Sequence, residues 1–286
     1  MTLWDRVEGL LEMICCGWFA GIHSSPPCNT FSAILFRTPG PKPVRNRSNL
    51  WGLPGLQGKD LLRCEVGSWL ARVAMAAVAL VAMCGGNSSL EHPKDAEREP
   101  FPSLWITEES RDMETARHPG RKLPFVRRDL DQCMFSAVKQ KPSTFSLNCV
   151  NSAKLCRLCT HTTHAGESLG GKDPQDPKVF KTSKYKEFPQ PLCRKLAKVH
   201  LDTMLLDKAE RPFQRQRKLP AAEQLRRHYP QAVIERAKSV EELRILGRLP
   251  CQACPSPFAH LRALRIGETV VAQVFSLIGL LAVATC

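Results

Sequence analysis

The final stretch of the chain constrains its fold more than any other feature, because it must be removed from water. Residues 270–286 read VVAQVFSLIGLLAVATC, carry no charge and include only Gln273, Ser276 and Thr285 as polar side chains. A helix in a soluble domain normally keeps a polar stripe, which this segment lacks. We therefore expect the segment to be buried in a membrane. The alternative is a helix or strand in the core of a soluble domain.

The length and flanks of this segment favour a membrane location. As a helix it spans about 25 Å, which suits a thin bilayer such as that of the ER. Arg262 and Arg265 precede it and nothing charged follows, so the positive-inside rule leaves the rest of the chain in the cytosol. This arrangement resembles that of tail-anchored proteins, with residues 269–286 as an anchor in the ER or mitochondrial outer membrane. The apolar anchor residues are Val270, Val271, Val274, Phe275, Leu277, Ile278, Leu280, Leu281 and Val283.

The positive charge of the chain is concentrated in its second half. The net charge is +14, and residues 116–268 alone hold 30 basic and 14 acidic side chains, a net charge of +16. Such a region favours anionic partners, either lipid headgroups at a membrane surface or nucleic acid. A protein partner is a further alternative. The residues predicted to contact an anionic surface are Arg211, Arg215, Arg217, Lys218, Arg226, Arg227, Arg262 and Arg265.

Proline, glycine and charge patterns divide the chain into five regions. Residues 1–89 are apolar and punctuated by proline and glycine, and residues 90–190 are expected to be largely disordered, acidic over 90–115 and then basic. Residues 191–249 are expected to form a basic helical unit, and 250–268 a linker before the anchor. The predicted fold class is therefore mostly irregular or disordered with short α-helices, a small all-α basic unit and one C-terminal apolar helix.

Two helices are predicted outside the anchor. The apolar run Val73–Cys84 is too short to span a bilayer, so we expect a buried core helix or a targeting segment, ended by Gly85 and Gly86. Leu192, Leu196, Val199, Thr203 and Leu206 recur on one helical face, and Pro212 is expected to end that helix. Further short helices are expected at residues 221–229 and 239–247.

Cysteine and histidine spacing predicts a zinc site as an alternative to free thiols in a reducing compartment. Cys156 and Cys159 form one C-x2-C pair, and Cys251 and Cys254 form another. Such a pair lets one turn supply two of the four ligands of a tetrahedral zinc ion. His161 and His164 lie close to the first pair but leave almost no loop for one peptide to surround an ion. The predicted ligands are therefore Cys156, Cys159, Cys251 and Cys254.

No motif of the sequence supports catalysis. Residues 166–170 match G-x-S-x-G, which resembles the nucleophile elbow of α/β-hydrolases, but the match lacks the preceding buried strand and the following helix. We therefore expect a non-enzymatic chain with no small-molecule substrate and no cofactor besides the zinc alternative.

The leading hypothesis for function is a single-pass, tail-anchored membrane protein with a basic, partly disordered cytosolic interaction region. The alternative is a soluble, basic nucleic-acid-binding or adaptor protein of the nucleus or cytoplasm, with a structural zinc. A third is a chain under little functional constraint, because residues 1–89 look unlike residues 90–268.

Overall fold

The chain folds as a mixed α/β domain in the computed structural model. The structure describes residues 10–11, 13–14, 19–36, 41–118, 120–121, 123–164, 175–176 and 187–210, with side chains described as far as residue 206. The four strands are β1 (Gly21–Ser24), β2 (Asn87–Pro93), β3 (Val126–Asp131) and β4 (Pro142–Leu147). The helices are α2 (Gly58–Met83), α3 (Glu108–Thr115) and α4 (Gln190–Glu210). The expectation of a mostly irregular chain with short α-helices is therefore wrong.

The strands form one sheet in the order β1-β2-β4-β3. β1 and β2 pair in parallel, with Gly21 opposite Asn87, and the other neighbours are antiparallel. A parallel pair needs a long crossover connection, which α2 supplies between β1 and β2. β3 and β4 form a hairpin, so the sheet combines one crossover unit with one hairpin, and β4 also pairs antiparallel with β2.

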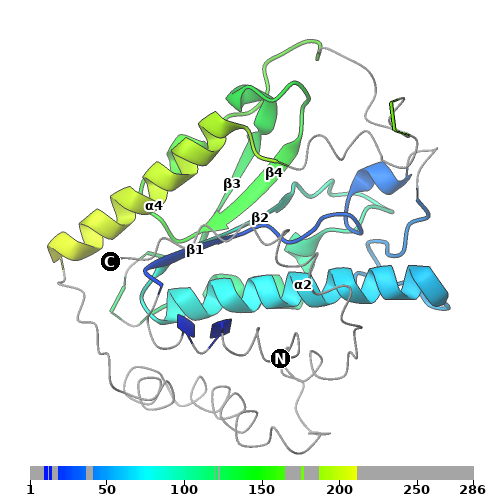
Figure 1. Cartoon of the computed structure of the whole chain (residues 1–286), viewed down its shortest axis with the longest axis horizontal. Coiled ribbons are helices and arrows are strands. Elements are labelled where there is room, and N and C mark those ends of the chain that lie inside the picture. The colour runs from blue at the N-terminus through cyan, green and yellow to red at the C-terminus, as the bar shows by residue number, and fades with distance from the viewer. Residues whose placement is uncertain are drawn as a thin grey trace, which may run out of the picture.

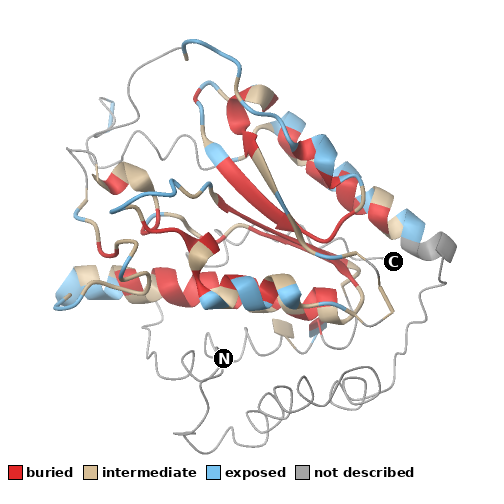
Figure 2. Ribbon diagram, turned by 180° about the vertical axis from the view of Figure 1, so that it is seen from behind, coloured by how far each residue is buried: buried red, intermediate tan, exposed pale blue. Residues whose placement is uncertain are grey.

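The sheet lies between two helical layers, with α2 along one face and α4 across the other (Figure 1). Ile22 and Leu90 pack against α2 in one hydrophobic cluster. Phe145 and Leu147 of β4 pack against α4 in a second cluster. The faces of the helices turned to the sheet are buried, and so is most of the sheet (Figure 2). The domain therefore has two cores, one on each side of the sheet.

α2 is longer than the predicted apolar run but ends where the sequence predicts. Gly85 has φ +83°, its N–H donates to the carbonyl of Ala82, and the Gly86 N–H donates to that of Val81. These two bonds are the Schellman motif that glycine favours at a helix C-terminus. Among the described residues, α2 is long and apolar enough to cross a membrane, but most of that stretch is buried within the fold. Its burial agrees with the core-helix alternative.

The predicted helix at Leu192 is confirmed as α4, but its setting differs from the expected one. Leu192, Leu196, Val199 and Thr203 are buried, as their spacing predicts, whereas Leu206 of the same predicted face is exposed. They pack on the sheet and not on other helices of an all-α basic unit, so that part of the fold-class prediction is wrong. Pro212 and the helices expected at 221–229 and 239–247 lie outside the described residues.

Residues 90–190, expected to be largely disordered, contain α3, β3, β4 and the second half of β2. The strands escape the sequence patterns because they are short and polar: β2 reads NSSLEHP, β3 VRRDLD and β4 PSTFSL. β2 and β3 lack the strict alternation of apolar and polar residues that marks a half-buried strand, and in β4 it covers only residues 144–147. Some of their polar groups instead find partners distant in sequence, as the Ser89 hydroxyl does with His23 and His200.

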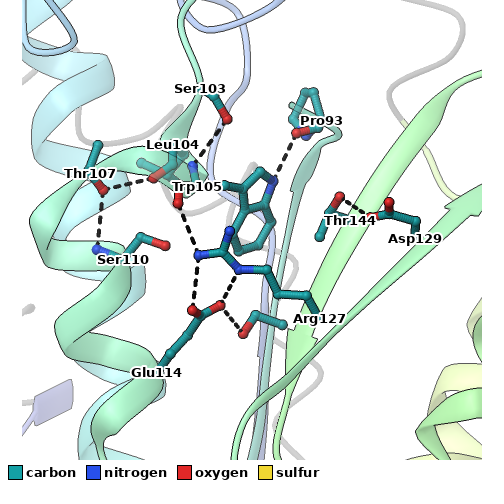
Figure 3. A network of polar contacts seen from close by, with 11 residues as sticks. Pro93, Ser103, Leu104, Trp105, Thr107, Ser110, Glu114, Arg127, Asp129 and Thr144 are labelled. Atoms are coloured by element: carbon teal, nitrogen blue, oxygen red, sulfur yellow. Dashed lines mark hydrogen bonds and ion pairs between the residues drawn. The ribbon is translucent and has the colours of Figure 1, made fainter. Parts of the chain in front are cut away.

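One such set of partners fixes α3 to the hairpin (Figure 3). The guanidinium of Arg127 in β3 donates from Nε and Nη2 to the two carboxylate oxygens of Glu114 in α3, at 2.7 and 2.9 Å. Nη2 also donates to the carbonyl of Trp105, 3.0 Å away, and the Trp105 indole donates to the carbonyl of Pro93 at 2.9 Å. Ser146 of β4 donates to Glu114 as well. Polar contacts therefore join α3 to β3 and β4, and Trp105 of the preceding 3-10 helix η2 (Leu104–Ile106) adds a contact to β2.

Candidate metal centre

Four side chains with metal-binding chemistry converge beside the β3–β4 hairpin. The ligand atoms of Cys133, Cys159, His161 and His164 all lie within 4.8 Å of one another. Cys133 belongs to η3 (Gln132–Phe135), the short 3-10 helix that directly follows β3. The other three belong to the segment that follows η4 (Ser152–Leu155). The cluster therefore joins two parts of the chain that are separate in sequence.

The spacing of the ligand atoms suits a tetrahedral ion. The Cys159 sulfur lies 3.3 Å from Nδ1 of His161 and 3.2 Å from Nε2 of His164. Zinc bonded to sulfur and to imidazole nitrogen at its usual distances holds the two ligand atoms about 3.6 Å apart. The two imidazole rings meet edge to face, with centroids 5.4 Å apart, so they do not stack. The two spacings from the Cys159 sulfur are therefore already close to those of a tetrahedral zinc site.

Asp131 holds the ligand segment against the hairpin. Its backbone N–H donates to the carbonyl of Arg157 at 2.8 Å. Its carboxylate accepts the N–H of Cys159 at 2.8 Å and the side-chain amide of Gln140 at 3.2 Å. Contacts of this kind orient metal ligands and fix their backbone. The two halves of the cluster are thus placed by the fold itself.

The two thiols differ in environment. Cys133 is buried, whereas Cys159 is partly exposed. Burial, and then a hydrogen bond with Cys159, raise the pKa of the Cys133 thiol to about 11. At neutral pH without metal, this thiol is therefore protonated, and binding of a metal ion must displace its proton.

The predicted ligand set is only partly brought together. Cys159 lies in the cluster, but Cys156 is exposed and does not belong to it. Cys251 and Cys254 lie outside the described residues, as do the anchor residues of 270–283 and all eight basic residues predicted to contact an anionic surface. His161 and His164 lie in the cluster although their short spacing argues against them, and the sequence pattern missed Cys133. Only the β3–β4 hairpin, which the sequence pattern did not reveal, brings that residue to the site.

A second polar cluster lies in the core below α4. The Ser89 hydroxyl lies 2.9 Å from Nδ1 of His23 and 2.8 Å from Nε2 of His200. All three residues are buried, and Ser89 has no exposed surface. A substrate has no access to this hydroxyl, so the cluster does not form a catalytic Ser–His pair. It links β1, β2 and α4 through side-chain hydrogen bonds.

Comparison with known proteins does not assign this chain to a family or suggest a function for it. A scan against family models and searches of curated proteins and of solved structures found no match to this chain.

Proposed function

We propose that the chain is a zinc-binding protein in which one ion joins the segment 156–164 to the β3–β4 hairpin. The convergence of two thiols and two imidazoles carries this proposal. Cys2His2 is a ligand set of structural zinc sites, and four protein ligands leave no open position for a substrate. The proposed role is therefore structural, in agreement with a non-enzymatic chain.

The donor atoms favour zinc over the abundant hard cations. Calcium and magnesium prefer oxygen ligands, whereas thiolates and imidazoles suit zinc. Cys133 forms the buried side of the cluster and His161 the exposed side. An ion can therefore enter from solvent on the His161 side without opening the hydrophobic core.

The full-length chain, reduced and loaded with zinc, is expected to bind one ion at this cluster. Cobalt in place of zinc should give the visible spectrum of a tetrahedral site with two thiolate ligands. C133S should lose that spectrum, because it removes the buried ligand. C156S is the matched control and should keep it, because Cys156 is a neighbouring exposed thiol outside the cluster. Equal cobalt spectra from C133S and the unchanged chain would refute the site.

We propose a membrane anchor as a second, compatible function. It is supported by the uncharged segment 270–286, preceded by Arg262 and Arg265. Insertion of that segment would place the zinc-binding domain at the cytosolic surface. The basic residues of 211–227 would add contact with anionic lipid headgroups.

Removal of residues 269–286 tests the anchor. The full-length chain should stay with membranes through an alkaline carbonate wash, whereas the shortened chain should become soluble. The full-length chain in the soluble fraction would contradict the anchor. Salt-sensitive retention on nucleic acid by both forms would instead favour the soluble nucleic-acid-binding alternative.

A further inference from the structure

We propose that Cys133 and Cys159 make the zinc site redox-sensitive: oxidation of the two thiolates to a disulfide by a peroxide releases the ion. This inference rests on the proposed zinc function. The cluster holds exactly the two sulfurs that such a step requires, one on each of the two segments that the ion joins. The other two ligands are imidazoles, which do not take part in the electron transfer.

The two sulfurs are close enough to be bonded after small movements. They lie within 4.8 Å of each other, and a tetrahedral zinc ion would hold them about 3.8 Å apart. A disulfide needs about 2.05 Å between the sulfurs. The movement falls on side chains and short loops, since Cys133 lies in a four-residue 3-10 helix and Cys159 in a segment without regular structure.

The fold keeps the two segments adjacent when the ion leaves. The bonds from Asp131 to the Arg157 carbonyl and to the Cys159 N–H do not involve the metal ligand atoms. The two sulfurs therefore stay near each other throughout the oxidation, which favours a bond between them over reaction with a distant thiol. The disulfide then replaces the ion as the link between the hairpin and the segment 156–164.

Exposure assigns different roles to the two thiolates. Cys159 is partly exposed and lies beside the exposed His161, so its sulfur is the one that peroxide can reach. It attacks one oxygen of hydrogen peroxide, the O–O bond breaks, and a sulfenic acid and hydroxide form. The buried Cys133 thiolate then attacks the Cys159 sulfur, and a second hydroxide leaves. Two electrons pass from sulfur to oxygen, and two protons from solvent convert the hydroxides to water.

Zinc is lost because the disulfide removes two of its four ligands. Neither sulfur of a disulfide is a thiolate, and the thiolate is the form that binds metal. His161 and His164 remain as two neutral ligands on an exposed segment. A reductant that restores both thiolates reverses the change and allows zinc to bind again.

The test uses the full-length chain, reduced, loaded with zinc and freed of excess metal. Zinc content is measured first, and then hydrogen peroxide is added in the presence of a chromogenic zinc chelator. We expect release of the ion, together with a non-reducing peptide map in which Cys133 is joined to Cys159. Subsequent reduction should restore zinc binding. C156S should behave in the same way, because Cys156 has no part in the step.

Each other outcome has a distinct meaning. A chain that takes up no zinc before peroxide is added overturns the proposed function and, with it, this inference. A chain that binds zinc but keeps it under peroxide overturns only the redox step. Zinc release with Cys156 joined to Cys159, or with no disulfide between the two ligand cysteines, also overturns it and leaves the zinc function intact.

Discussion

Lowering the pH from 7 to 5 is expected to reduce the free energy of unfolding by about 6 kcal/mol. Burial lowers the pKa of His23 and of His92 to about 3, and that of His200 to about 4. In the unfolded chain these groups have the ordinary histidine value of 6.5. The unfolded state therefore binds more protons below pH 6.5, and stability is lost as pH falls from there towards the folded values.

The surroundings of each histidine explain why the folded chain resists protonation. Burial is the main cause in all three. The positive charge of Arg45, and then that of Lys141, further lowers the pKa of His92. His23 is affected by His200, with which it shares the Ser89 hydroxyl, and His200 by Arg121. Between pH 6.5 and 5 each histidine contributes about 1.4 kcal/mol per pH unit, which urea unfolding at a series of pH values measures.

His92→Leu is the variant that isolates one of the three contributions. Both ring nitrogens of His92 are buried, with no hydrogen-bond partner among the described residues. Their removal leaves no donor or acceptor unpaired, so the variant should be at least as stable as the parent at pH 7. Its loss of stability on acidification should be about one third smaller. An unchanged pH dependence in this variant would contradict the assignment.

Phe145→Ala is expected to lower the free energy of unfolding by about 3–5 kcal/mol. Phe145 is fully buried at the centre of the α4-side cluster. Its ring stacks on His23 at a centroid distance of 5.7 Å and contacts Phe188 at 5.9 Å. Truncation removes these contacts and leaves a cavity between the sheet and α4. Such a loss is a large share of the roughly 5–15 kcal/mol that stabilises most domains.

Urea unfolding at pH 7 measures this cost, and two variants serve as controls. Phe145→Leu keeps most of the volume and should cost less than half as much. Val138→Ala truncates a side chain that is 58% exposed, and its effect should stay within about 0.5 kcal/mol. A Phe145→Ala cost as small as that of Val138→Ala would mean that α4 does not cover this face of the sheet.

The sequence predicts the helices of this fold much better than its strands. An apolar stripe such as Leu192, Leu196 and Val199 is local information, and so is the glycine pair that ends α2. β2 is buried although it is mostly polar, and several of its groups find partners far along the chain: the Ser88 N–H donates to the side chain of Asn148, and Ser89 contacts His200. Those partners exist only once the sheet and α4 are assembled.

The candidate metal site likewise depends partly on residues close in sequence and partly on a contact between distant residues. Cys159 belongs to a predicted C-x2-C pair, but the short spacing of His161 and His164 argues against a site made by one peptide, so they are not among the predicted ligands. The fourth ligand is not the neighbouring Cys156 but Cys133, which lies 26 positions before Cys159. The turn at the end of β3 and the bonds of Asp131 bring it there, so spacing alone could not select it.

The position of α4 sets the order in which the chain can fold as it is synthesised. The strands are complete at Leu147, but the helix that covers Phe145 and Leu147 does not begin until Gln190. A nascent chain therefore lacks the α4 side chains that pack on this face until α4 leaves the ribosome. Exposed apolar surface promotes aggregation during folding. We therefore expect the chain to be most prone to aggregation in the interval between the synthesis of β4 and that of α4.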